Sequence, residues 1–147
     1  MSVVIATTAV VDPRAQLGEG VRVGHFSVIG PDAKIGDRTL IEEHVVVTGH
    51  TTIGEHNHIF PGTVIGAHPQ DTSYKNTPTK VIIGDNNVFR EHVTVNRATE
   101  KEDGITEIGN DNFLMASAHV AHDCRVGDRI VLANNTMLGG HARIGND

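Results

Sequence analysis

The stretch AHVAHDC, residues 118–124, contains side chains that can move a proton. His119 and His122 are three residues apart, and Asp123 directly follows the second histidine. A neutral imidazole accepts a proton near neutral pH, and a carboxylate beside it can orient the ring and stabilise the imidazolium. Neighbouring side chains on a straight strand point to opposite faces, so a contact between His122 and Asp123 requires a bend at residues 122–123. The pair predicts a general base on a bent backbone.

Other polar residues are easier to explain as parts of a scaffold. The chain has ten histidines, so a single histidine is weak support for chemistry. Most of them are expected to face solvent without a catalytic role: His25, His44, His50, His56, His58, His68 and His92. Cys124 falls where small residues recur, and we assign it to packing. Asn134 and Asn135 are expected to form a side-chain ladder at a turn.

A repeat of six residues supplies the elements that must position the candidate site. Valine, isoleucine or leucine occupies every sixth position from Ile5 to Ile65, and the repeat resumes at Ile83 and at Ile108. Glycine often follows the aliphatic residue, and a small or branched residue often lies four positions after it. A period of six fits neither a helix nor a simple alternating strand. It fits a short strand plus a turn, laid down three times per coil to form a triangular prism.

The composition agrees with a prism that has a thin interior. The chain has 147 residues, with no Trp, one Tyr and four Phe, so its core must consist mostly of branched aliphatic side chains. Two polar segments, residues 67–82 and 98–106, interrupt the repeat and are predicted to be loops thrown out from the prism. Loops on a rigid scaffold often hold binding groups, although both segments could also be tolerated insertions.

Charge and hydropathy limit the classes of partner. A net charge of −6 gives no broad basic field, so we expect neither a nucleic-acid partner nor an anionic membrane surface. A single cysteine excludes an internal disulfide. No apolar run approaches the roughly 18 residues of a membrane span, and no basic segment precedes the apolar N-terminus. The expectation is one cytoplasmic domain, residues 1–147, without a membrane span.

These patterns identify a resemblance to a known family. The repeat resembles the hexapeptide-repeat left-handed parallel β-helix over essentially the whole chain, which implies an all-β solenoid of roughly seven coils; its handedness comes from the resemblance alone. Residues 112–141, with the strings AHVAHDC, LANN and GGH, are similar to the signature region of the UDP-N-acetylglucosamine O-acyltransferase family. The segments REHVTVNRAT, residues 90–99, and PQDTSY, residues 69–74, also resemble parts of that family.

The resemblance implies a reaction and its partners. It implies transfer of a 3-hydroxyacyl group from acyl carrier protein to the 3-hydroxyl of UDP-N-acetylglucosamine, the first step of lipid A biosynthesis, in a homotrimer with sites between subunits. The thioester is already activated, so no covalent enzyme intermediate is required. Neither a cofactor nor a metal is expected. By resemblance, His122 is the catalytic base and Asp123 its partner, while the Gly140 N–H stabilises the oxyanion. His119, His141, Asp71 and Gln70 then bind and position the substrates.

The chain departs from the family pattern in two places. Ser73 stands where the family usually has a lysine, two residues after Asp71. Lys75, two residues further on, would replace that lysine only if the loop bends differently. The sequence ends at HARIGND, and we expect the family's helical C-terminal domain to be absent.

Two alternatives use the same fold. One is a zinc enzyme similar to γ-class carbonic anhydrase, whose ligands include a histidine pair spaced H-x4-H, where this chain has H-x2-H at His119 and His122. The other is an inert, truncated β-helix trimer.

Overall fold

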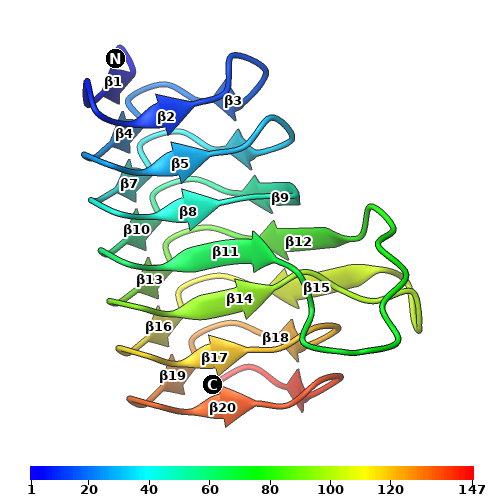
Figure 1. The fold of residues 1–147 in the computed structure, drawn as a ribbon. Helices are drawn as coiled ribbons and strands as arrows, with labels where there is room; N and C mark the ends of the chain where they lie inside the picture. Colours follow the sequence, from blue (N-terminus) through cyan, green and yellow to red (C-terminus); the bar gives the residue numbers. More distant parts are fainter.

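The computed structural model describes residues 1–147, which form a three-sided prism of short strands (Figure 1). There are 21 strands in three parallel sheets of seven. The first sheet contains β1 (Val4–Ile5), β4 (Arg22–Val23), β7 (Leu40–Ile41), β10 (His58–Ile59), β13 (Val88–Phe89), β16 (Phe113–Leu114) and β19 (Val131–Leu132). The second contains β2 (Val10–Val11), β5 (Val28–Ile29), β8 (Val46–Val47), β11 (Val64–Ala67), β14 (Thr94–Asn96), β17 (His119–Val120) and β20 (Met137–Leu138). The third contains β3 (Gln16–Leu17), β6 (Lys34–Ile35), β9 (His50–Ile53), β12 (Lys80–Ile83), β15 (Ile105–Ile108), β18 (Arg125–Val126) and β21 (Arg143–Ile144).

Each strand pairs with the strand one coil away, which confirms the predicted solenoid. Val4 is in register with Arg22 and Leu40 with His58, so an uninterrupted coil takes 18 residues. The sheets follow one another in a left-handed parallel β-helix of seven coils. Such a helix is an exception to the right-handed crossovers of most parallel sheets.

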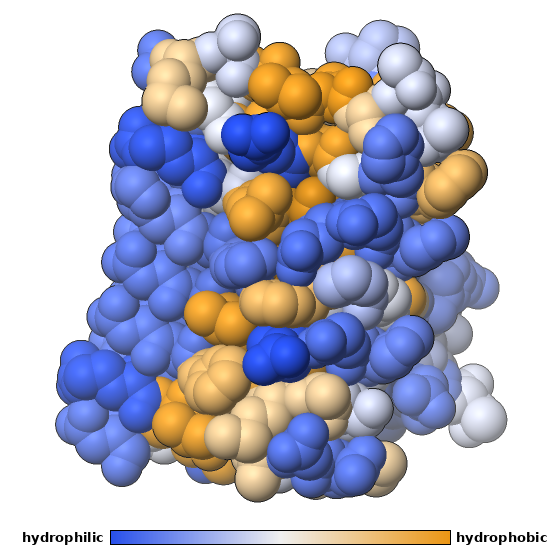
Figure 2. All heavy atoms as spheres, turned by 90° about the vertical axis from the view of Figure 1, so that its left-hand side faces the viewer, coloured by the Kyte–Doolittle hydropathy of each residue, from blue (hydrophilic) through white to orange (hydrophobic).

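The core is the stack of aliphatic residues that the period of six predicts. Ile29, Ile41, Ile53, Ile59 and Ile65 are all fully buried or nearly so. Small residues four positions later, such as Ala33, Thr39 and Thr51, are also buried. The aliphatic residues of the end coils are more exposed, since each has a neighbouring coil on one side only. Figure 2 shows apolar side chains reaching the surface toward both ends of the prism, with a more hydrophilic zone between.

The two predicted loops exist but are shorter than expected. They span residues 68–79, between β11 and β12, and residues 97–104, between β14 and β15. The predicted ends of both loops were too late because β12 and β15 are four-residue strands that pair along their whole length. The second loop begins one residue before its predicted start, since β14 ends at Asn96. In Figure 1 the first loop runs beside the prism toward the later coils, and the second lies next to it. This course brings residues from the fourth and fifth coils to the sixth and seventh.

A ladder of buried asparagines does occur, but at a different corner from the predicted one. The Asn57 side-chain carbonyl accepts the Asn87 N–H, and the Asn87 carbonyl accepts the Asn112 N–H, each at 2.9 Å. Asn134 and Asn135 are exposed and take no part in this ladder. The prediction for these two was wrong because the ladder needs the inward-facing position of the turn.

The fold contains no helix long and apolar enough to span a membrane.

Candidate active site

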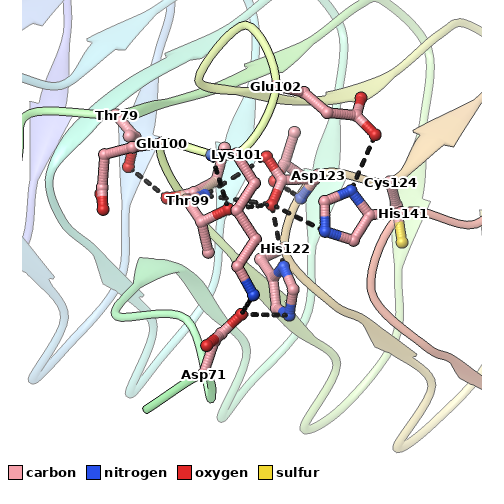
Figure 3. A network of polar contacts seen from close by, with 12 residues as sticks. Asp71, Thr79, Thr99, Glu100, Lys101, Glu102, His122, Asp123, Cys124 and His141 are labelled. Carbon is pink, nitrogen blue, oxygen red and sulfur yellow. Dashed lines mark hydrogen bonds and ion pairs between the residues drawn. The ribbon is translucent and has the colours of Figure 1, made fainter. Parts of the chain in front are cut away.

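His122 and Asp123 lie at the corner between β17 and β18, where the backbone makes the predicted bend. Asp123 has a φ of +63°, and His141, one coil later, has a φ of +66°. This conformation turns the Asp123 side chain back to its neighbour, and His122 Nδ1 lies 2.9 Å from Asp123 Oδ2. The His122–Asp123 contact therefore exists, and Nε2 is the ring nitrogen that does not face Asp123 (Figure 3).

Asp123 is fixed by the second loop and the strand after it. Its carboxylate is buried and accepts hydrogen bonds from the Thr99 hydroxyl at 2.6 Å and the Thr99 N–H at 3.2 Å. The Asp123 N–H donates to the Thr106 hydroxyl at 2.9 Å. A buried carboxylate needs such hydrogen-bond partners. These bonds fix the orientation of the Asp123 carboxylate that contacts His122.

The first loop brings Asp71 close to Nε2 of His122. Asp71 Oδ2 lies 3.8 Å from His122 Nε2 and 2.7 Å from Lys101 Nζ (Figure 3). Asp71 Oδ1 accepts the Ser73 N–H at 2.8 Å and the Ser73 hydroxyl at 2.7 Å. Hydrogen bonds from Lys101 and then Ser73 hold the pKa of Asp71 well below its ordinary value. Asp71 is therefore an ionised acceptor beside the proposed base.

His141 faces the same pair from the seventh coil. Its Nε2 lies 3.7 Å from Asp123 Oδ2, and its ring meets the His122 ring edge-on with centroids 5.2 Å apart. Its Nδ1 contacts Glu102 Oε1 at 2.8 Å, and Glu102 also pairs with Arg143. Bonds with His141 and then Arg143 lower the pKa of Glu102. His141 is thus held between two carboxylates.

A groove of about 520 Å³ opens beside His122. Its lining includes Gln70 from the first loop, His119, His122, Gly140 and Met137. His119 Nδ1 lies 2.7 Å from the Thr94 hydroxyl, and desolvation lowers the pKa of His119. The structure brings all seven predicted site residues to this groove or to the polar network beside it: Gln70, Asp71, His119, His122, Asp123, Gly140 and His141.

Gly140 lies against the His122 ring. A Cβ on Gly140 would fall 2.4 Å from His122 Cε1 and 2.6 Å from His122 Nε2, so only glycine leaves the ring in place. The Gly140 N–H makes no hydrogen bond to another backbone group of the chain. This N–H is available to a ligand in the groove.

Three donor groups, from His122, Asp123 and His141, lie within 4.8 Å of one another. Zinc prefers a tetrahedral set of donors that are free to coordinate. Here Asp123 already accepts two hydrogen bonds from Thr99, and His122 Nδ1 is turned to Asp123. Because Asp123 and His122 Nδ1 are engaged in these contacts, the cluster suits acid–base chemistry better than metal binding.

Sequence reasoning missed the residues of the second loop. Thr99, Lys101 and Glu102 each bond to a different site residue, respectively Asp123, Asp71 and His141. The contact with Asp71 is made by Lys101, while Lys75 on the first loop is exposed. The one sequence signal was the break in the repeat at residues 98–106, which marks a loop without saying where it folds.

The residues assigned to the scaffold stay outside this network. None of the seven histidines predicted to face solvent contacts His122, Asp123 or His141. Cys124 is a buried free thiol whose Sγ lies 3.2 Å from the Gly139 carbonyl, and burial raises its pKa. A buried thiol of this kind is a packing residue.

The fold and the site define a hexapeptide-repeat β-helix with a histidine–carboxylate site at one corner. The family model described as bacterial transferase hexapeptide (six repeats) matches residues 14–49 and 105–140. Among curated proteins, the chain is 56% identical over 140 residues to the acyl-[acyl-carrier-protein]–UDP-N-acetylglucosamine O-acyltransferase of Herminiimonas arsenicoxydans, covering 95% of this chain and 53% of that protein. Identity to the enzyme of the same name from Stenotrophomonas maltophilia strain R551-3 is also 56%, over 97% of this chain and 54% of the relative.

Solved structures agree with the sequence comparisons. The LpxA structure from Acinetobacter baumannii superposes with a TM-score of 0.96 at 43% identity, over 97% of this chain and 55% of that one. UDP-N-acetylglucosamine O-acyltransferase from Moraxella catarrhalis gives 0.94 at 42% identity, over 97% of this chain and 55% of that one. The chain belongs to the UDP-N-acetylglucosamine O-acyltransferase family. It spans about half the length of the curated relatives it matches.

Proposed function

We propose that the protein transfers a 3-hydroxyacyl group from acyl carrier protein to the 3-hydroxyl of UDP-N-acetylglucosamine, the first step of lipid A biosynthesis. The observation that supports this most is the contact between His122 and Asp123 beside an open groove that His122 lines. The other ring nitrogen of His122, Nε2, lies near the ionised carboxylate of Asp71. Membership of the O-acyltransferase family supplies the substrate class.

Because the thioester is already activated, the reaction requires a general base and no covalent enzyme intermediate. His122 Nε2 takes the hydroxyl proton while the hydroxyl oxygen attacks the thioester carbonyl, and Asp123 stabilises the imidazolium through Nδ1. The carbonyl oxygen becomes an oxyanion, which accepts a hydrogen bond from the Gly140 N–H, a group without a backbone partner in the chain. When the intermediate collapses, the carrier's thiolate leaves and regains a proton from His122. His119, His141, Asp71 and Gln70 position the two substrates.

The protein acts in this proposal as a cytoplasmic homotrimer with one site near each subunit boundary. Apolar side chains that a single prism leaves exposed support the assembly, among them Val10, Phe26, Val28 and Met137. Paired prism faces would cover them and would also enclose the groove.

Mass spectrometry of the reaction tests the function. The 147-residue chain is incubated with UDP-N-acetylglucosamine and a 3-hydroxyacyl carrier protein, and we expect the 3-O-acyl sugar nucleotide and free carrier thiol in equal amounts. A folded chain that binds both substrates and forms no product would contradict the proposal. The same preparations separate the alternatives: retained zinc in equimolar amount with carbon dioxide hydration would indicate the zinc enzyme, and no activity of either kind the inert scaffold.

A further inference from the structure

The contact between Lys101 and Asp71 has no part in the reaction steps given above. Lys101 lies on the second loop and Asp71 on the first, 30 positions earlier in the sequence, and the bond between them is 2.7 Å long. Asp71 Oδ2 accepts this bond, and the same oxygen lies 3.8 Å from His122 Nε2 (Figure 3). One oxygen therefore lies between a permanent cation and the nitrogen that must accept a proton.

We propose that Lys101 is a positioning residue of the acceptor site, which holds Asp71 for a substrate hydroxyl and keeps it from pairing with His122 Nε2. This inference rests on the proposed function. A carboxylate next to an imidazole favours the imidazolium and forms an ion pair with it. An ion pair with Asp71 would occupy Nε2 and remove the base. Lys101 prevents this by donating a hydrogen bond to the Asp71 carboxylate.

The charged groups around His122 explain why Asp71 requires a cationic partner. Asp123 faces its Nδ1, Asp71 its Nε2, and the rings of His141 and His119 lie on further sides. Two carboxylates thus flank one imidazole. The Asp123 carboxylate contacts Thr99 and the two histidines but no lysine or arginine, and Arg143 bonds to Asp123 only at its backbone carbonyl. Lys101 is the cation bonded to Asp71. Glu102 and Arg143 lie on the other side of His141, where they bond to each other.

The remaining hydrogen-bond capacity points to the ligand. Ser73 fills Asp71 Oδ1 with two bonds, so Oδ2 is the oxygen that can accept from a hydroxyl beside the reacting one. An ammonium has three N–H donors, and Asp71 takes one of them. The half-exposed Lys101 side chain can give the others to hydroxyl or phosphate oxygens of a sugar nucleotide. Because Lys101 and Asp71 come from different loops, this arrangement also locks the loops together.

The test is a proton NMR titration of histidine-labelled protein with neutral and charge-preserving variants. The His122 signal is assigned as the one that disappears in His122→Gln. In Lys101→Met we expect this signal to titrate about one pH unit or more higher than in the native chain, because Asp71 becomes free to pair with the ring. Lys101→Arg should keep the native midpoint. Lys75→Met removes an exposed lysine from the first loop that does not bond to Asp71, and should leave the midpoint unchanged.

A second variant separates electrostatics from simple disruption of the loops. Lys101→Met combined with Asp71→Asn removes the unpaired carboxylate, so the His122 midpoint should return toward the native value. A midpoint that does not move in Lys101→Met, or that stays raised in the double variant, overturns the inference.

Kinetics extend the test to catalysis. With acyl transfer as the assay, kcat/KM of Lys101→Met should fall about tenfold for each unit of midpoint shift at pH values below both midpoints, and recover as pH rises above the raised midpoint. A loss that is the same at every pH would mean a structural role only. The NMR titration needs no turnover, so a failure of the proposed acyl transfer and a failure of the role of Lys101 are recognised separately.

Discussion

At the scale of single residues, the geometry of the site depends on backbone conformations that few residues adopt. Asp123 and His141 both take a positive φ at the same corner of successive coils. Non-glycine residues adopt this region rarely, and asparagine and aspartate tolerate it better than most. The bend is what lets two neighbouring residues touch, so the His122–Asp123 pair is a property of the corner as much as of the two side chains.

Gly140 offers a direct test of that geometry. Gly140→Ala should move the His122 ring, since the new Cβ would lie 2.4 Å from its Cε1, and acyl transfer should fall on the order of 100-fold. Gly145→Ala is the matched control because its Cβ would meet nothing within 4 Å. Rates are compared after circular dichroism shows that both variants are folded. Equal turnover in the two variants would mean that the ring position does not matter.

The contact between His122 and Asp123 could be predicted from the sequence, whereas the residues that hold the pair in place could not. The string AHVAHDC placed a base and a carboxylate together and required the bend that is present. No sequence motif marks Thr99, Lys101 or Glu102. Their partners lie 24 to 39 positions away in the sequence, so these contacts depend on how the second loop folds against the rest of the chain. Loop conformation is a tertiary property, which the repeat leaves undefined.

At the scale of elements, the turns between strands are stabilised by side chains as well as by sheet hydrogen bonds. The Asn57–Asn87–Asn112 ladder satisfies buried backbone N–H groups on three successive coils. The period of six predicted the buried aliphatic stack well, since burial repeats with the sequence. It did not identify the ladder, because loop insertions change the spacing between these asparagines from 18 residues to 30 and 25.

Removing the middle asparagine should destabilise the fold. Asn87→Ala leaves the Asn112 N–H and the Gly109 carbonyl without their partners inside the protein, which costs about 2–4 kcal/mol in free energy of unfolding. Urea unfolding measures the loss. Asn134→Ala, at an exposed turn outside the ladder, should change stability by less than about 0.5 kcal/mol. If both variants unfold at the same urea concentration, the ladder contributes nothing.

Acid should release the second loop before the prism unfolds. The pKa values of Asp71 and Glu102 lie below their ordinary values of 3.8 and 4.5. Such carboxyls stabilise the fold at pH above those values, and this stability disappears as pH falls through the lower, folded pKa. Their bonds to Lys101 and His141 then break, and the Thr99 amide should lose hydrogen-exchange protection. Protection of Thr99 that persists until the Leu114 amide of β16 also exchanges would contradict this order.

At the scale of the whole molecule, one prism has a thin core and leaves several large apolar side chains at its surface, as Figure 2 shows on one side. We expect association to bury them. Sedimentation equilibrium at micromolar concentration should give three times the chain mass of 15.7 kDa. A mass of 15.7 kDa under those conditions would contradict the proposed trimer and the site at its subunit boundary.

The central claim is that His122 is the base for acyl transfer. The most direct measurement is the rate of acyl-sugar formation by the native chain and by His122→Ala under the same saturating substrates, with sedimentation confirming the same assembly in both. Loss of a positioned general base predicts a rate 10² to 10⁴ times lower, roughly, in the variant. A variant that keeps near-native turnover in an unchanged assembly would show that some other group takes the proton.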